Sequence, residues 1–338
     1  MEGLSYAFDF SPTSPAYSLA TDLIIISLIL CAIALGLARA IGSKKLWSWG
    51  VEELAQAIIN AALLGSIMGL GTIAGAFTGV MQIAPIAGCS YLDSAANSPI
   101  AYSLCSIEAS QNKTWQIIDG ANSQSFYLGA LSSMQLSFEV VSASPFSSLS
   151  YAAKNYSDWS AQLSSLLSLL ELNRQFLLFI SQAAFALFLP VGLLLRMFFA
   201  TRKLGGAMMA GSISFFIVYP LLYAAFLSGP LLGETPIFET AYTQAYSDLN
   251  ELSATLNFMP TIDWGKEPDM VQLLASLEGK NLLEQASLPY KSVSAFEGAV
   301  SMQAILYPLI CLALTLICAK ELSGLLGSQF RLDLFDKI

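Results

Sequence analysis

The stretch from Leu19 to Ile41 reads LATDLIIISLILCAIALGLARAI and contains only two charged side chains, Asp22 and Arg39. An α-helix needs about 20 predominantly apolar residues to cross a hydrocarbon core about 30 Å thick. No basic residue precedes the stretch, and its apolar core is longer than that of a signal peptide. The stretch therefore predicts a retained transmembrane helix.

The composition of the whole chain extends this prediction. Of the 338 residues, 55% are hydrophobic and 12% are charged, whereas a soluble domain carries roughly a quarter charged residues. Further apolar stretches predict membrane spans at about 57–84, 176–200, 204–228 and 299–319. We expect an all-α, polytopic membrane protein that crosses the lipid bilayer with about five transmembrane helices.

Basic residues divide unevenly between the connections, which predicts the orientation of the chain. Nine of the fifteen lie on one predicted side of the membrane: Arg39, Lys44, Lys45, Arg196, Arg202, Lys203, Lys320, Arg331 and Lys337. Because positively charged connections stay in the cytoplasm, the N-terminus is expected outside and the C-terminus inside. The expected location is the cell (plasma) membrane, in a multi-pass arrangement.

These spans divide the chain into seven segments. They are an outer N-terminal segment (1–18), transmembrane helices 1–2 with a short cytoplasmic interfacial helix (19–84), outer segment 1 (85–175), a transmembrane helical hairpin 3–4 (176–228), an acidic outer segment 2 (229–298), transmembrane helix 5 (299–319) and a cytoplasmic amphipathic tail (320–338). Both outer segments are too long to be structureless connections.

Helical periodicity predicts elements within the outer segments. In outer segment 1, a helix over 159–172 runs straight into the third span, and 123–142 predicts a further helix. In outer segment 2, amphipathic helices are expected over 237–256 and 269–286. The outer segments therefore contribute amphipathic helices to the fold.

Outer segment 1 also contains residues that are open to covalent modification. Cys89 and Cys105 are the only cysteines predicted outside, where an oxidising environment favours a disulfide between them; two unpaired thiols are the alternative. Asn112 and Asn155 each begin an N-x-[ST] sequence and are candidate glycosylation sites.

The second span carries a stripe of small residues on one helical face. These residues are Gly65, Gly69, Gly71, Thr72, Gly75, Ala76 and Gly79. Small side chains let helix backbones approach closely within a membrane. The stripe predicts either a packing interface, within one subunit or between subunits, or a surface that faces a pore.

The turn between spans three and four is short and basic. Its residues are Arg196, Arg202, Lys203, Gly205 and Gly206, and we expect it in the cytoplasm. Proline residues at 190, 220 and 308 lie within predicted spans, where they permit kinks. Few ionisable residues lie at mid-span, which argues against a proton-coupled transporter.

The sequence offers no catalytic signature. Histidine is absent, which excludes the commonest general base and metal ligand. No G-x-x-x-x-G-K-[ST] phosphate loop and no H-E-x-x-H zinc motif occurs either. We therefore expect no catalytic residue, no cofactor, no metal ion and no enzyme activity.

Two regions carry a resemblance to a known family. The first runs from Leu189-Pro190-Val191-Gly192 through Thr201-Arg202-Lys203-Leu204-Gly205-Gly206 to Tyr219-Pro220, and the second from Leu325-Leu326-Gly327 to Leu332-Asp333-Leu334-Phe335. Together with the predicted topology, they resemble the polytopic inner-membrane channel subunit of type IV secretion systems, in its archaeal, CedA-like branch of the Ced DNA-import system.

The resemblance implies an oligomeric channel subunit for DNA import. It also implies two partners, a cytoplasmic secretion ATPase and small pilin-like membrane proteins. Contact with single-stranded DNA would be transient, because the sequence shows no basic, aromatic-lined groove. The alternatives are a small-solute transporter or ion channel, and a structural membrane anchor for a pilus or surface layer.

Overall fold

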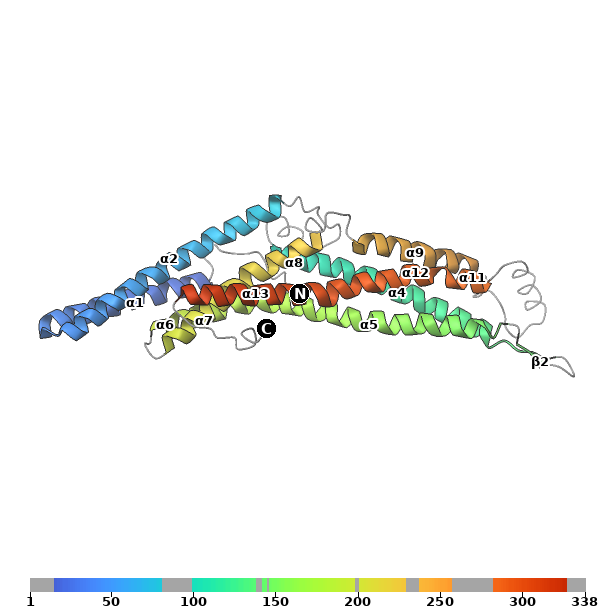
Figure 1. The fold of residues 1–338 in the computed structure, drawn as a ribbon, viewed down its shortest axis with the longest axis horizontal. Coiled ribbons are helices and arrows are strands. Elements are labelled where there is room, and N and C mark those ends of the chain that lie inside the picture. The colour runs from blue at the N-terminus through green and yellow to red at the C-terminus, as the bar shows by residue number, and fades with distance from the viewer. Residues whose placement is uncertain are drawn as a thin grey trace. The chain divides into compact units, whose positions relative to one another are not determined.

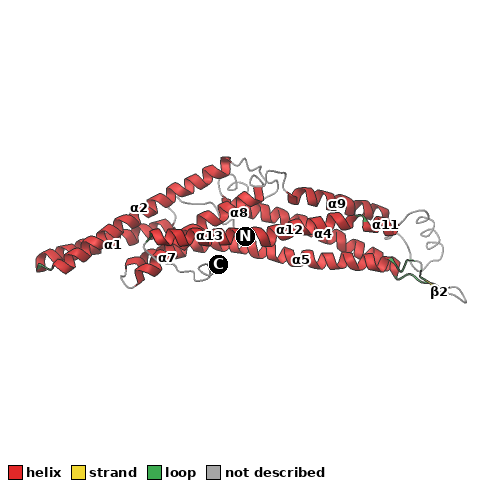
Figure 2. Ribbon diagram, viewed as in Figure 1, coloured by secondary structure: helices red, strands yellow, loops and turns green. Residues whose placement is uncertain are grey.

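The computed structural model describes residues 15–80, 99–137, 142–144, 146–197, 201–228, 237–256 and 282–326. These residues are helical apart from one small β-hairpin (Figures 1 and 2). The chain divides into two compact units. Unit 1 draws on Met1–Ser106, Asn173–Leu232 and Tyr307–Ile338, and unit 2 on Ile107–Leu172 and Gly233–Leu306.

Unit 1 begins with a helical hairpin of α1 (Pro15–Ile41) and α2 (Lys44–Val80). The turn between them is tight because Gly42 adopts a φ of 70°, a left-handed conformation that suits glycine at a helix end. The helix predicted to lead into the second span forms the start of α2, which runs without a break from Lys44, and its position at a membrane surface stays a prediction. Residues 81–84 of that span lie outside the described residues.

Three long apolar helices each contain a π-helical segment. They are α5 (Leu149–Phe179), η1 (Ile180–Phe188) and α6 (Leu189–Met197); α7 (Arg202–Ile213), η3 (Ser214–Val218) and α8 (Tyr219–Ser228); and α12 (Pro289–Ser301), η5 (Met302–Leu306) and α13 (Tyr307–Leu325). A proline is the second residue of each following α-helix, at positions 190, 220 and 308. Because proline clashes with the carbonyl four residues earlier, and that carbonyl falls inside each π segment, the wider π turn accommodates the ring.

Four helices in the described part of the chain are long and apolar enough to cross a membrane. They span Ser18–Ile41, Leu149–Gln182, Arg202–Ser228 and Pro289–Gly324. The prediction of an all-helical protein with transmembrane helices is thus supported by length and composition, while the count of five and the orientation stay predictions. The predicted continuation of the 159–172 helix into the third span is confirmed by α5, η1 and α6.

Unit 2 is a helical bundle whose elements agree only in part with the predictions. Helix α9 (Ile237–Leu256) confirms the predicted 237–256 helix. The predicted 123–142 helix is wrong beyond Ser132, where α4 (Pro99–Ser132) ends. Strands β1 (Leu136–Ser137) and β2 (Ser142–Ala143) follow and pair antiparallel. Of the predicted 269–286 helix, 269–281 lie outside the described residues, and α11 (Leu282–Ser287) covers the rest.

Aromatic packing and polar contacts hold the helices of unit 2 together. Phe296 of α12 is fully buried and contacts the rings of Phe238 and Tyr242 on α9, with centroids 5.4 and 6.1 Å away. Lys113 of α4 pairs with Glu239 of α9. Burial, followed by the neighbouring Tyr246 and Glu239, raises the pKa of Tyr242. At neutral pH its phenol therefore stays protonated, and it donates a hydrogen bond to Gln116 on α4.

The burial of Phe296 predicts a large effect of truncation. Phe296→Ala should lower the stability of unit 2 by about 3–5 kcal/mol, because it removes a ring from a packed core. Phe126→Ala is the matched control, since this ring on α4 is 71% exposed, and a change within about 0.5 kcal/mol is expected. Thermal unfolding of the full chain in detergent measures both; equal shifts would contradict the assigned core.

Candidate functional site: an arginine cluster between α2 and the α6–α7 hairpin

Helices α6 and α7 meet through two glycines. A Cβ atom on Gly205 would lie 2.6 Å from the backbone nitrogen of Arg196 and 2.6 Å from the carbonyl oxygen of Gly192. A Cβ atom on Gly192 would lie 2.8 Å from Cγ of Met209. Neither position has room for a side chain, so the two backbones pack in direct contact, as small residues allow between membrane helices.

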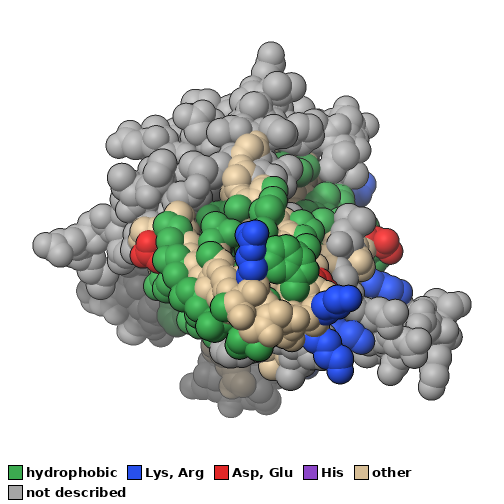
Figure 3. Space-filling model, turned by 90° about the vertical axis from the view of Figure 1, so that its left-hand side faces the viewer, with side chains coloured by type: hydrophobic (Ala, Val, Ile, Leu, Met, Phe, Trp, Pro, Cys, Tyr) green, Lys and Arg blue, Asp and Glu red, His purple; other side chains and the backbone are tan. Residues whose placement is uncertain are grey.

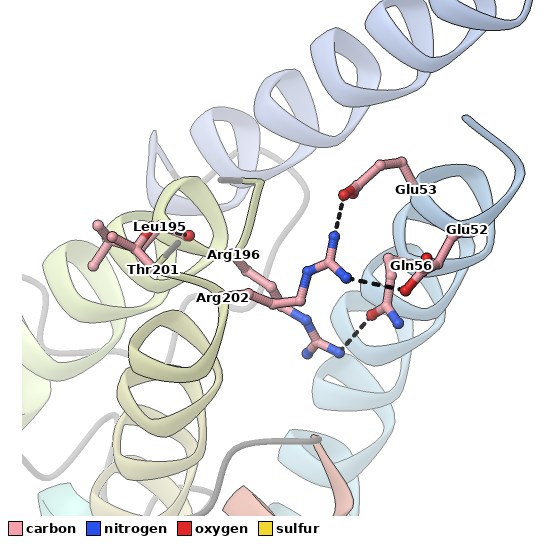
Figure 4. Close-up of polar contacts among 7 residues, drawn as sticks. All are labelled: Glu52, Glu53, Gln56, Leu195, Arg196, Thr201 and Arg202. Atoms are coloured by element: carbon pink, nitrogen blue, oxygen red, sulfur yellow. Dashed lines mark hydrogen bonds and ion pairs between the residues drawn. The ribbon is translucent and has the colours of Figure 1, made fainter. Parts of the chain in front are cut away.

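This crossing places two arginines beside α2. Arg202, in the first turn of α7, pairs through Nη2 with Glu53 and lies 3.5 Å through Nη1 from Glu52 (Figure 4). Arg196 of α6 points to the same face of α2, where its Nη2 donates a hydrogen bond of 3.0 Å to Oε1 of Gln56. The hydroxyl of Thr201 donates to the carbonyl of Leu195 and thereby closes the turn.

The two arginines differ in how well they are compensated. Arg202 has the carboxylate of Glu53, whose side chain is only 10% exposed. Arg196 is 5% exposed, and its Nε and Nη1 find no hydrogen-bond partner among the described residues. The same holds for Oδ1 of Asn60, one helical turn beyond Gln56 on α2. Because an uncompensated buried charge costs free energy, Arg196 is a source of strain in this cluster.

Further basic side chains surround the cluster at this end of unit 1. Arg39, Lys44 and Lys45 flank the α1–α2 turn, and Lys203 follows Arg202 in α7; all four are exposed. Figure 3 views this end and shows Lys and Arg side chains among apolar ones. Both connections that were predicted to be cytoplasmic thus carry exposed basic side chains.

The predicted small-residue stripe lies on α2 but does not form the close helix contact of unit 1. Gly65 and Gly69 are exposed, and no heavy atom of the described structure lies within 4 Å of where their Cβ atoms would be. Gly71, Thr72, Gly75, Ala76 and Gly79 also belong to α2, and their surroundings lie outside the described structure. The close helix crossing of unit 1 is therefore made by Gly192 and Gly205 and not by these two stripe positions.

The candidate modification sites have different environments. Cys105 is disulfide-bonded, while Cys89 lies outside the described residues, so the pairing of these two stays a prediction. Asn112 is exposed on α4. Asn155 is half-buried in α5, where its amide donates to the phenol oxygen of Tyr290 at 3.3 Å. Of the two, Asn112 offers the more accessible amide.

Sequence reasoning found the basic turn but missed its partners on α2. Glu52 and Glu53 were expected in an interfacial helix, and Gln56 was not singled out. Only the spacing of Glu52 and Gln56 along one side of a helix hinted at a shared contact. No group of three or more His, Cys, Asp or Glu in the described residues is placed to hold a metal ion. The cluster is thus an electrostatic contact between helices.

Comparisons of the chain with protein-family models, with curated proteins and with solved structures find no match. The function must therefore be inferred from the residues and geometry of the chain itself.

The Gly192–Gly205 crossing predicts a position-specific effect of one methyl group. Gly205→Ala should destabilise the full chain by about 1–3 kcal/mol, because the added Cβ forces the two backbones apart. Gly211→Ala on the same helix is the control, since its Cβ position meets open space. Thermal unfolding in detergent distinguishes them; a Gly205→Ala variant as stable as the control would refute the close crossing.

The two adjacent acids on α2 should contribute unequally. Glu53→Gln is expected to cost about 1.5–3 kcal/mol, as for a hydrogen bond to a charged group with little solvent access. Glu52→Gln should cost less than about 1 kcal/mol, because that side chain is 66% exposed. The difference should appear in thermal midpoints measured at neutral pH, and a larger loss for Glu52→Gln would contradict the geometry.

Proposed function

We propose that this chain is a channel subunit of a membrane machine that transfers DNA, of the type IV secretion-like kind. It would cross the cell membrane about five times, with its N-terminus outside and its C-terminus in the cytoplasm. Several copies would assemble around the path of the DNA strand.

A membrane location is supported by where the apolar side chains lie. Ile29 and Leu30 of α1 and Leu309 of α13 are each more than half exposed. All three lie in helices long enough to span a bilayer. In water such a surface would be unfavourable at roughly 25 cal/mol for each Å² exposed, whereas hydrocarbon accommodates it.

The observation that carries the assembly is the open face of α2 at Gly65. A helix that presents a glycine to its surroundings permits close approach of another helix. Because no heavy atom of the described structure lies within 4 Å of the Cβ position of Gly65, a neighbouring subunit is the proposed occupant of this face. A closed ring of such contacts would enclose a path through the membrane.

The DNA cargo and the partners rest on the resemblance. Its first motif falls on α6, the start of α7 and the start of α8, which includes both glycines of the crossing and both arginines of the cluster. The proposed partners are a cytoplasmic secretion ATPase, which would supply energy because this chain has no phosphate-binding loop, and small pilin-like membrane proteins. Contact with single-stranded DNA would be brief.

The stripe gives the first mutational test. A Gly65→Leu/Gly69→Leu variant should reduce chromosomal-marker exchange between cells by about tenfold or more, since each 1.4 kcal/mol lost from an association is tenfold in its constant. Gly36→Leu on α1 is the matched control, because Gly36 is also exposed with open space around it. Immunoblots of the membrane fraction confirm equal amounts of each variant.

The same exchange assay is run on a strain that lacks the gene and on that strain complemented with the gene. Unchanged exchange in the deletion strain would overturn the DNA-transfer proposal. Specific solute flux in liposomes that contain this chain alone would instead support a solute transporter or ion channel. Loss of surface filaments with normal exchange would support a structural anchor.

A further inference from the structure

Exposed basic and aromatic side chains flank the α1–α2 turn of unit 1. We call them the basic belt, and its members are Arg39, Lys44, Lys45, Trp47 and Trp49. Arg39 lies in the last turn of α1, and the other four lie in the first two turns of α2. All five side chains are exposed.

The belt lies where a candidate span ends. The span Ser18–Ile41 stops just before Lys44. At 1.5 Å per residue, the 24 residues of the first span cover about 36 Å, slightly more than a hydrocarbon core. The lysines that follow are therefore at the level of lipid headgroups and their phosphates.

The side chains of the belt are of the kinds that are enriched at the lipid headgroup layer. Trp47 and Trp49 are 48% and 44% exposed, and indole rings are enriched at the headgroup layer because they are apolar with one polar N–H. Ile41, next to the belt, is 71% exposed and faces hydrocarbon in this placement. A surface solvated only by water would leave three large apolar side chains without a favourable environment.

The charges of the belt are not neutralised within the described structure. The nearby acids Glu52 and Glu53 are engaged by Arg202. No ion pair in the described part of the chain involves Arg39, Lys44 or Lys45. The belt therefore presents three cations to whatever lies against it, which favours an anionic partner.

We propose that the basic belt binds the phosphate groups of anionic membrane lipids in preference to zwitterionic ones. Lysine ammonium groups contact the phosphates, while the two tryptophans hold the turn at the headgroup layer. The inference rests on the membrane-spanning part of the proposed function and is independent of DNA transfer.

Native mass spectrometry of the detergent-solubilised full chain tests this, with phosphatidylglycerol and phosphatidylcholine offered in equal amounts. The wild type should retain phosphatidylglycerol selectively. An Arg39→Gln/Lys44→Gln/Lys45→Gln variant should lose roughly fivefold in this preference for each charge removed. An Arg39→Lys/Lys44→Arg/Lys45→Arg variant keeps the charges and should retain the preference.

The matched control removes exposed lysines of unit 2. Lys154→Gln/Lys291→Gln should leave the preference unchanged, and thermal unfolding shows whether each variant is folded. Equal retention of both lipids by the wild type, or undiminished preference in the folded triple Gln variant, overturns the inference. Complete displacement of phosphatidylglycerol by inorganic phosphate overturns the lipid assignment in favour of a soluble-phosphate site.

Marker exchange separates this result from the proposed function. A triple Gln variant that loses lipid preference but exchanges DNA normally supports lipid binding by itself. A variant that keeps its lipid preference and loses exchange overturns the lipid inference and leaves DNA transfer standing, with an acidic protein as the partner of the belt.

Discussion

Hydrocarbon offers no hydrogen-bond partner to a polypeptide backbone, so each segment that crosses it must satisfy its own N–H and C=O groups. The candidate spans of this chain meet that constraint as helices. The same solvent removes the usual advantage of burying leucine and isoleucine, which remain exposed on α1 and α13. What holds such helices together must then be backbone proximity and polar contact.

Unit 1 shows both. The absence of side chains at Gly192 and Gly205 brings α6 and α7 into contact, and this crossing directs Arg196 and Arg202 toward α2. Arg202 gains a carboxylate there, whereas the partner of Arg196 among the described residues is the amide of Gln56. A hydrophobic residue at position 196 would avoid the cost of burying a charge, so stability alone does not account for this arginine.

Much of this fold could be predicted from hydrophobic periodicity and charge. Helix α9 has its predicted bounds, and the basic hairpin turn is where the Lys and Arg residues indicated. The pairing of Glu53 with Arg202, 149 positions away, could not be predicted from local pattern. The helix predicted over 123–142 is wrong beyond Ser132, because periodicity alone does not show where a chain reverses into a hairpin. Contacts between distant segments, such as Gly192 with Gly205, leave no local pattern.

The three π segments change how positions along these helices correspond. A π-helix bonds residue i to i+5, one residue more than an α-helix, so the face presented after the segment is rotated relative to the face before it. A single helical wheel drawn through α7 and α8 would therefore misassign which side chains share a side. The π segment Ser214–Val218 contains one residue more than an α-helix of the same length would need, and this extra residue accompanies Pro220. A related chain without that proline could be one residue shorter there and still present the same surfaces at both ends.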